Sequence, residues 1–116
     1  MFSYERLEVY KMAIEINHKV YRLLKENTQL VHYAKNQLGK ACLSVMLNIA
    51  EGSGKFSAKD RRNFFIIARG SVFECSSLIS FLYGEGELDE TVRNDLYVSF
   101  EKISRLLYTM IRNLEK

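Results

Sequence analysis

The sequence of 116 residues contains no proline and no tryptophan, and only two cysteines. Proline makes up about 5% of an average protein. Helix interiors exclude it, because it removes a hydrogen-bond donor and clashes with the preceding turn. Its absence therefore favours an all-helical chain whose loops depend on glycine. With 47% hydrophobic and 27% charged residues, the composition is that of a globular protein, and the length predicts one domain over residues 1–116.

Neither the cysteines nor the hydrophobic runs indicate secretion or a membrane. Cys42 and Cys75 fall within apolar helical patterns, without metal-ligand spacing around them. Because a free cysteine behaves as a small buried hydrophobe, we expect both thiols to pack in the core. The N-terminus lacks a basic segment followed by an apolar run. The longest unbroken apolar run, residues 64–68, is too short to cross a bilayer. We therefore expect a cytoplasmic location and no membrane partner.

Hydrophobic residues recur at spacings of three and four in four segments, at about residues 4–26, 29–51, 57–83 and 89–115. This spacing places them along one face of a helix. Four amphipathic helices with short connections predict an all-α, antiparallel, up-down-up-down four-helix bundle. The first and third segments carry apolar residues on more than one face, which suggests that a second subunit covers part of them.

Residues at the segment ends predict how the helices begin and stop. Asn27 or Thr28 is expected to cap the second helix through its side-chain oxygen. Ser57 is expected to cap the third, with Asp60 completing a capping box. Asp89 is expected to cap the fourth helix, and Gly52 to end the second in a left-handed conformation.

Two patterns that resemble catalytic motifs fail. The run Gly52-Ser53-Gly54-Lys55 resembles a phosphate-binding loop, but Ile49 stands where that motif needs glycine and Phe56 where it needs serine or threonine. The two histidines lie on different helices, and only His18 ends a Glu-x-x-His run, which starts at Glu15, so the paired motif of a di-metal bundle is absent. We predict no enzyme activity, no cofactor and no metal site.

Several polar residues stand within apolar helical patterns, and a structural role for them is favoured over a catalytic one. Buried charges need partners. We therefore expect a hydrogen-bonded network between the second and third helices, made of Asn48, Glu51, Arg69, Ser71 and Glu74.

The formal net charge is +3, and the basic residues point to anionic partners. Phosphate contacts need cations without a special arrangement. The candidates for nucleic-acid binding are Arg22, Lys35, Lys40, Lys55, Lys59, Arg61, Arg62 and Arg69. Four of them, between Lys55 and Arg62, cluster at the connection between the second and third helices. A helix surface that faces water needs the same residue types. The alternative, that these cations only solvate the surface and bind no nucleic acid, therefore stays open.

Three segments carry a family resemblance. Residues 2–13 resemble the opening segment of a protein family. Residues 37–52, which contain Asn48-Ile49-Ala50-Glu51-Gly52, resemble the central signature of that family. Residues 64–74 resemble the segment that follows the signature. The chain is thereby similar to the 23S rRNA-intervening sequence protein family, four-helix-bundle proteins related to the accessory variability determinant of diversity-generating retroelements. It departs from the family pattern at Met46, where proline is usual, and at Gly39, where arginine is frequent.

The resemblance implies a ring-like homopentamer. The retroelement relatives bind nucleic acid and a reverse transcriptase through a basic surface, so a reverse transcriptase is a partner by analogy only. Taken with the basic clusters, this predicts a non-enzymatic homo-oligomer that binds RNA or DNA. The alternative is a protein-interaction scaffold without nucleic-acid contact.

Overall fold

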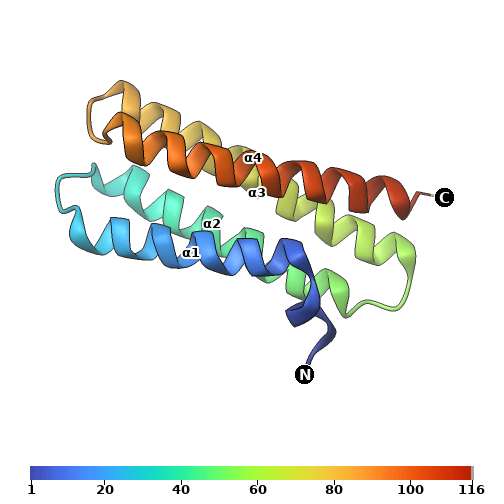
Figure 1. Cartoon of the computed structure of the whole chain (residues 1–116). Coiled ribbons are helices and arrows are strands. Elements are labelled where there is room, and N and C mark those ends of the chain that lie inside the picture. The colour runs from blue at the N-terminus through green and yellow to red at the C-terminus, as the bar shows by residue number, and fades with distance from the viewer. Residues whose placement is uncertain (116) are drawn as a thin grey trace.

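The computed structural model describes residues 1–115, which form four α-helices and no strand. The elements are a short 3-10 helix η1 (Ser3–Arg6), α1 (Glu8–Glu26), α2 (His32–Ser53), α3 (Ala58–Gly84) and α4 (Glu90–Asn113). In Figure 1, α1 and α2 lie side by side, and α3 and α4 form a second pair. The α1–α2 and α3–α4 connections lie at one end of the molecule, and the α2–α3 connection lies at the other (Figure 1). The predicted all-α class is confirmed.

Two predicted helix caps are present, and the first helix starts later than predicted. The Ser57 side chain accepts a hydrogen bond from the Asp60 amide at 3.0 Å. The described residues show no return bond from the Ser57 amide to the Asp60 carboxylate, so only half of the predicted capping box forms. The Asp89 carboxylate accepts one from the Val92 amide at 2.8 Å. At the N-terminus the extended backbone of Leu7 separates η1 from α1, because its ψ of 129° interrupts the helical hydrogen bonds.

The predicted caps of α2 are wrong. The helix begins at His32 behind Val31, and Val31 makes no side-chain cap. Its amide instead donates to Glu87 Oε1 in the α3–α4 connection at 2.7 Å. The Asn27 side chain accepts from the Gln29 amide at 3.3 Å within the connecting turn. A contact from a distant part of the chain thus sets the start of α2, where the sequence suggested a local one at Asn27 or Thr28.

The predicted left-handed cap at Gly52 is also wrong. The α2 helix continues through Gly52 to Ser53, and within the described range only Gly86 has a positive φ. Gly52 is buried, and a Cβ added to it would stand 2.8 Å from Phe64 Cβ and 2.9 Å from Phe65 Cε1. Glycine is therefore needed at this position for the close approach of α2 and α3.

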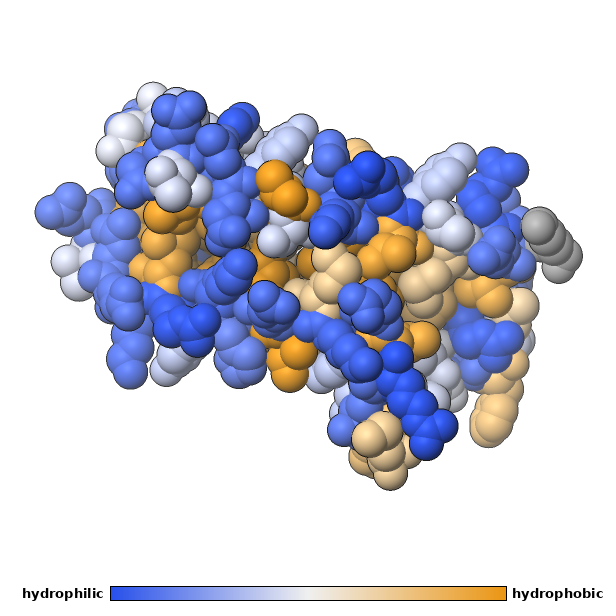
Figure 2. Space-filling model, in the orientation of Figure 1, coloured by the Kyte–Doolittle hydropathy of each residue, from blue (hydrophilic) through white to orange (hydrophobic). Residues whose placement is uncertain are grey.

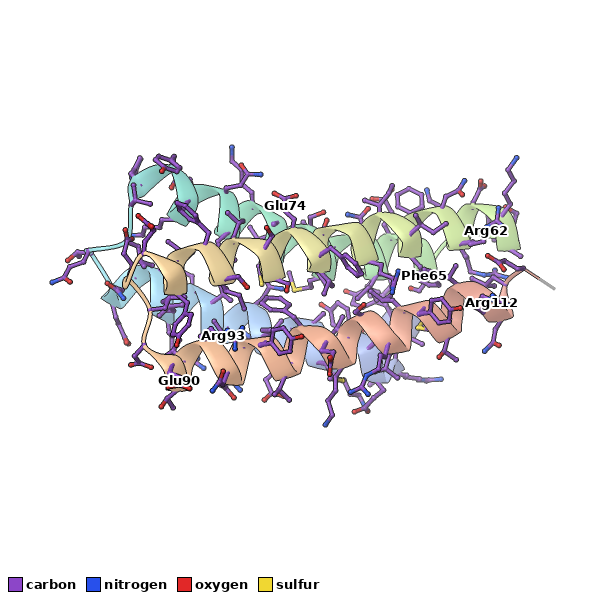
Figure 3. All side chains as sticks on the ribbon, turned by 90° about the horizontal axis from the view of Figure 1, so that it is seen from above. Arg62, Phe65, Glu74, Glu90, Arg93 and Arg112 are labelled. Atoms are coloured by element: carbon purple, nitrogen blue, oxygen red, sulfur yellow. The ribbon has the colours of Figure 1, made fainter. Side chains whose placement is uncertain are left out.

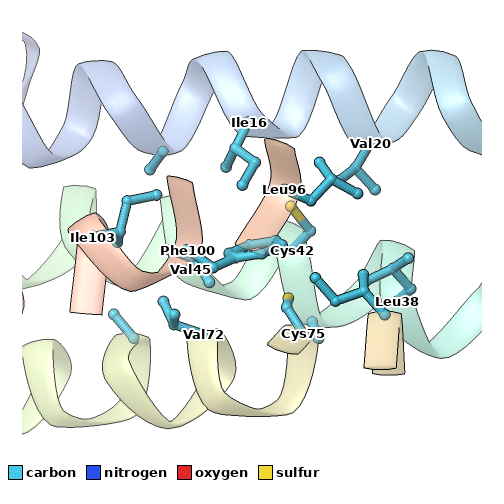
Figure 4. Packing of buried hydrophobic residues seen from close by; sticks show 14 of the residues in the cluster. Ile16, Val20, Leu38, Cys42, Val45, Val72, Cys75, Leu96, Phe100 and Ile103 are labelled. Atoms are coloured by element: carbon cyan, nitrogen blue, oxygen red, sulfur yellow. The ribbon is translucent and has the colours of Figure 1, made fainter. Parts of the chain in front are cut away.

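One hydrophobic core joins all four helices. Cys42 and Cys75 lie within it as free thiols, as predicted (Figure 4). The neighbouring Cys42 thiol and burial together hold the pKa of Cys75 well above its usual range. Other fully buried members are Ile16, Leu38, Val45, Ile49, Ile79, Phe100, Ile103 and Leu107. On the face seen in Figure 2, hydrophobic residues lie between the two helix pairs, and hydrophilic ones border them.

The longest helix keeps much of its apolar surface exposed. By length and composition alone α3 could cross a membrane, with a mean hydropathy of 1.5 over its most apolar window, of which 33% is buried in the bundle. A core helix of a water-soluble protein passes the same criterion. The exposed apolar side chains of α3 are Ile66, Ile67, Phe73 and Phe81. Their exposure leaves room for a further partner on this helix.

Candidate nucleic-acid interface

Four of the predicted cations lie together at the α2–α3 connection. We call this group, Lys55, Lys59, Arg61 and Arg62, the basic end. Arg61 Nη1 donates to the carbonyl oxygens of Lys55 at 3.0 Å and Phe56 at 2.9 Å. These bonds hold the connection in one conformation, with the Phe56 ring fully exposed. Lys59 is exposed in the first turn of α3.

The remaining members of the basic end have weak or absent partners. Lys55 Nζ lies 3.7 Å from Glu51 Oε2 and 5.0 Å from the centre of the Phe64 ring. Arg62 Nε is buried without a hydrogen-bond partner in the part of the chain that the structure describes. An exposed pair such as Lys55–Glu51 is worth little, so the ammonium group remains accessible to an anion.

Three predicted cations lie away from the basic end. Lys35 is near the start of α2, about 30 Å from Lys55 at the helical rise of about 1.5 Å per residue. Lys40 is exposed on the same helix, and Arg22 is exposed near the end of α1. The sequence candidates therefore do not form one continuous patch on a single chain.

The predicted polar network is only partly formed. Ser44 Oγ and Ser71 Oγ are hydrogen-bonded at 2.8 Å, and Asn48 Nδ2 donates to Ser44 Oγ at 3.0 Å. Ser44, absent from the prediction, thus links Asn48 with Ser71.

Both carboxylates of the predicted network bind elsewhere. Glu51 pairs with Lys55, and Glu74 accepts a hydrogen bond from Gln37. In the α2–α3 pair, Gly52 faces Phe65. Glu74 lies nine residues further along α3, about 13 Å at the helical rise. Glu51 and Glu74 are therefore too far apart to act as a carboxylate pair.

Arg69 also leaves the predicted network and crosses to α4. Its Nε donates to the carbonyl oxygen of Ser104 at 3.3 Å. Its guanidinium carbon lies 4.8 Å from the centre of the Phe73 ring and 5.3 Å from that of Tyr108. A guanidinium over an aromatic face is attracted by the ring quadrupole, so α3 and α4 together hold this side chain in place.

The same arrangement recurs along the outer surface between α3 and α4. Arg93 lies 5.4 Å from the ring centre of Tyr83 and 5.1 Å from that of Tyr97. Arg112 lies 6.0 Å from the ring centre of Tyr108. We call this surface the arginine–aromatic groove; its arginines and rings are Arg69, Phe73, Tyr83, Arg93, Tyr97, Tyr108 and Arg112.

Of the residues in this groove, only Arg69 is a candidate predicted from the sequence. A readable signal was present, since the pairs 69/73, 93/97 and 108/112 each join an arginine and an aromatic residue four positions apart. Residues at that spacing share one side of a helix.

A second groove runs between α1 and α2 and is mostly apolar. It has a volume of about 590 Å³, and Ile14, Tyr21, Leu24, Leu43 and Met46 are among its lining residues. Lys25, Lys35 and His18 also line it. Among residues 1–115 no group of three or more His, Cys, Asp or Glu side chains is placed to hold a metal ion. The groups that the structure does bring together are guanidinium, ammonium and aromatic groups, which bind anions and flat rings.

Comparisons with known proteins agree with this fold. A family model described as 23S rRNA-intervening sequence protein matches residues 5–109. A solved structure of a protein with unknown function from the S23 ribosomal protein family of Bacteroides thetaiotaomicron superposes with a TM-score of 0.85. It is 21% identical, and the match covers 89% of this chain and 97% of the other. At that identity the similarity shows the fold alone. No curated protein gives a significant match.

Proposed function

Since the chain belongs to the 23S rRNA-intervening sequence protein family, we propose that it is a non-enzymatic, homo-oligomeric bundle of up-down-up-down topology that binds RNA or DNA through basic surface residues. The name of the family links it to ribosomal RNA genes. The proposal assigns the chain a binding role without a chemical step. RNA is the first ligand to test.

The observation that carries this proposal is the basic end. Lys55, Lys59, Arg61 and Arg62 come from eight consecutive residues, and Arg61 bonds fix the connection that presents them. Phosphate contacts come from such cations, and they supply most of the affinity in non-specific binding. The exposed Phe56 ring beside them offers a face on which a base can stack.

Fluorescence anisotropy with a labelled RNA, titrated at several salt concentrations, tests the proposal. Binding at low salt should weaken as salt rises, because cations of the protein displace counterions from the phosphates. The double substitution Lys55→Gln/Lys59→Gln should reduce the log–log salt slope by roughly 0.7 per lost phosphate contact on a single strand. Lys11→Gln/Lys102→Gln removes the same charge at exposed positions of α1 and α4 and is the control. Absence of binding at low salt, or affinity independent of salt, would refute the proposal.

Self-association belongs to the same proposal. The α1–α2 groove leaves a mostly apolar surface uncovered on the single chain. Contiguous exposed apolar surface marks interaction sites, and the family resemblance suggests a ring of five subunits. Light scattering at micromolar protein gives the mass directly, and a mass equal to the 13.5 kDa of one chain would exclude the oligomer.

The second candidate function is a protein-interaction scaffold, and the α1–α2 groove is the observation that favours it. An apolar groove between two helices fits the apolar face of a partner helix. A reverse transcriptase is the partner suggested by analogy. A pull-down that recovers one protein after nuclease treatment, and loses it with Leu43→Glu, would favour the scaffold over nucleic-acid binding.

A further inference from the structure

We infer that the arginine–aromatic groove between α3 and α4 binds a single-stranded nucleic acid, with unpaired bases stacked on Phe73 and Tyr97 and phosphates held by Arg69, Arg93 and Arg112. This inference rests on the proposed nucleic-acid binding. It adds a location distinct from the basic end, a contact mode and a preference for unpaired strands.

Two of the three arginines of the groove, Arg69 and Arg93, are held in place by neutral groups. Arg93 lies between two tyrosine rings, and its Nε is buried without a hydrogen-bond partner among the described residues. Its Nη1 donates to the neutral Asn94 side chain at 3.0 Å. Arg69 bonds a backbone carbonyl, which carries no charge. A planar guanidinium held in this way retains the donors that bind phosphate.

Two carboxylates line the hollows of the groove, and one pairs with a cation outside the groove and the other with an arginine of the groove itself. Glu101 Oε1 lies 3.5 Å from Arg105 Nη2. Glu115 Oε2 lies 3.6 Å from Arg112 Nε, at the end of the groove. The three arginines of the groove therefore exceed the carboxylates that line it, and this charge suits an anionic ligand.

Two hollows in the groove are placed to receive flat rings. The first, of about 240 Å³, has Phe73 and Tyr97 among its walls, and Ser76, Ser104 and Glu101 also line it. These three side chains supply hydrogen-bond donors and acceptors for a base edge.

The second hollow, of about 480 Å³, lies on the other side of the same Phe73. Arg69, Tyr108 and Arg112 are among its lining residues. Gly70 also lines it, and a Cβ added to Gly70 would meet no atom within 4 Å. Phe73 thus separates two spaces, each with an aromatic wall.

The exposure of the rings favours an unpaired strand over a duplex. Phe73 is 56% exposed, Tyr108 48% and Tyr97 40%, although each has an arginine beside it. Bases in a duplex are stacked on one another and present mainly phosphates, whereas an unpaired base can stack on an exposed ring.

The groove also leads toward the basic end. Figure 3 shows Arg93 near one end of α4 and Arg112 near the other, with Arg62 of α3 at the same end of the molecule as Arg112. A strand that follows the groove therefore reaches the proposed phosphate contacts at the α2–α3 connection. A protein partner is the other occupant that such a surface can take, because Tyr and Arg are also frequent at the centres of protein interfaces.

The test compares three ligands on the unaltered protein by fluorescence anisotropy at low salt. They are an unstructured single-stranded RNA, a duplex of the same length, and a strand of the same length without bases. Stacking on an aromatic residue strengthens binding roughly 5- to 150-fold per base. We therefore expect the strand without bases to bind at least about fivefold more weakly than the complete strand. Equal affinity for all three ligands would overturn the inference.

Two matched substitution pairs locate the site. Phe73→Leu/Tyr97→Leu removes the rings but keeps the side chains apolar, and it should abolish the advantage of the complete strand over the one without bases. Tyr33→Leu/Phe81→Leu is the control, because these rings are 69% and 45% exposed and line neither hollow. Unchanged discrimination in the groove variant would overturn the inference, and thermal unfolding shows that each variant is folded.

A charge-conserving pair tests the arginines. Arg93→Lys keeps the charge but loses the planar group between Tyr83 and Tyr97, and it should weaken single-strand binding several-fold. Arg6→Lys, at an exposed position of η1, should have no effect.

The possible failures are distinguishable. If the unaltered protein binds no nucleic acid, the proposed function falls together with the inference. If it binds duplex and single strand equally and the groove variants behave as the unaltered protein, only the inference falls. If the groove variants change the mass in light scattering and leave binding intact, the groove is a protein interface, which also overturns the inference.

Discussion

Gly52 of α2 lies so close to Phe65 of α3 that a Cβ atom on Gly52 would stand 2.9 Å from the Cε1 atom of the ring. The added atom would also stand 2.8 Å from Phe64 Cβ, which rotation of the Phe64 side chain cannot move away. The two helices thus pack closely in the last turn of α2, directly before the connection that carries the basic end. The position of this connection depends on a residue without a side chain.

We expect Gly52→Ala to destabilise the protein by about 1–2 kcal/mol. Overpacking of a core costs about 1–3 kcal/mol, and the higher helix propensity of alanine, worth up to about 1 kcal/mol, offsets only part of this. Urea unfolding at a fixed protein concentration measures the change. A variant as stable as the unaltered protein would show that the helices separate freely here.

Gly70→Ala is the matched substitution in the neighbouring helix, and we expect the opposite sign. Gly70 lies inside α3, and its added Cβ would meet no atom within 4 Å. Alanine should therefore stabilise the helix by roughly 0.5–1 kcal/mol through its lower loss of backbone entropy. The same urea titration measures this. A loss of stability would indicate that another chain packs against Gly70.

The hydrogen bond between Ser44 and Ser71 should appear as a coupling energy. Single substitutions to alanine and the double variant form a cycle, from which we expect a coupling of about 0.5–1.5 kcal/mol. Ser80 is exposed on α3, so the cycle of Ser44→Ala with Ser80→Ala should give a coupling near zero. Similar values from both cycles would argue against a specific bond.

The buried Cys75 thiol should make the protein less stable at alkaline pH. The neighbouring Cys42 and burial raise the pKa of Cys75 above its ordinary value of 9.0. Above that pH the unfolded chain loses a proton that the folded chain keeps. The stability is therefore complete below about pH 9 and declines as pH rises, with a slope that approaches about 1.4 kcal/mol per pH unit.

The variant Cys75→Ala isolates this effect when unfolding is measured between about pH 8 and 10. Its free energy of unfolding should decline less steeply with pH than that of the unaltered protein. Tyr10 serves as an internal reference, because burial, Tyr4 and Glu5 raise its pKa above the ordinary 10.0 in both proteins. Parallel pH profiles would contradict the role given to Cys75.

Self-association should depend on the α1–α2 groove. Leu43 lines this groove and is 49% exposed, so Leu43→Glu places a charge where the proposal puts an apolar contact. We expect a smaller particle in light scattering. Val98→Glu changes a similarly exposed residue of α4 outside this groove and should leave the mass unchanged.

Local features of the sequence predicted the helices and two of their caps, because periodicity and caps such as Ser57 and Asp89 act within a few residues. Contacts between segments that are distant in the sequence could not be predicted from these local features. Gly52 has the chemistry of a helix stop, and only the proximity of Phe65 reveals its other role. The start of α2 depends likewise on Glu87, which lies 56 residues away from Val31.

The candidate site likewise has one part that the sequence predicts and one part that it does not. The basic end was visible because its cations are adjacent in the sequence. The arrangement of Arg93 between Tyr83 and Tyr97 was not, because its two rings belong to different helices. For Arg69 the charge was recognised but the partner was not, since Ser104 and Tyr108 approach it only when α4 packs against α3.

The bonds from Arg61 to the carbonyl groups of Lys55 and Phe56 have a consequence for association. They restrict the α2–α3 connection before any ligand arrives, so the Phe56 ring is displayed by a segment whose conformational entropy was already lost on folding. Ordering an interface side chain or loop normally subtracts from affinity. A partner that stacks on Phe56 does not have to order this connection, so most of that entropic cost is absent from its binding free energy. A small contact area here can therefore contribute a large share of the affinity.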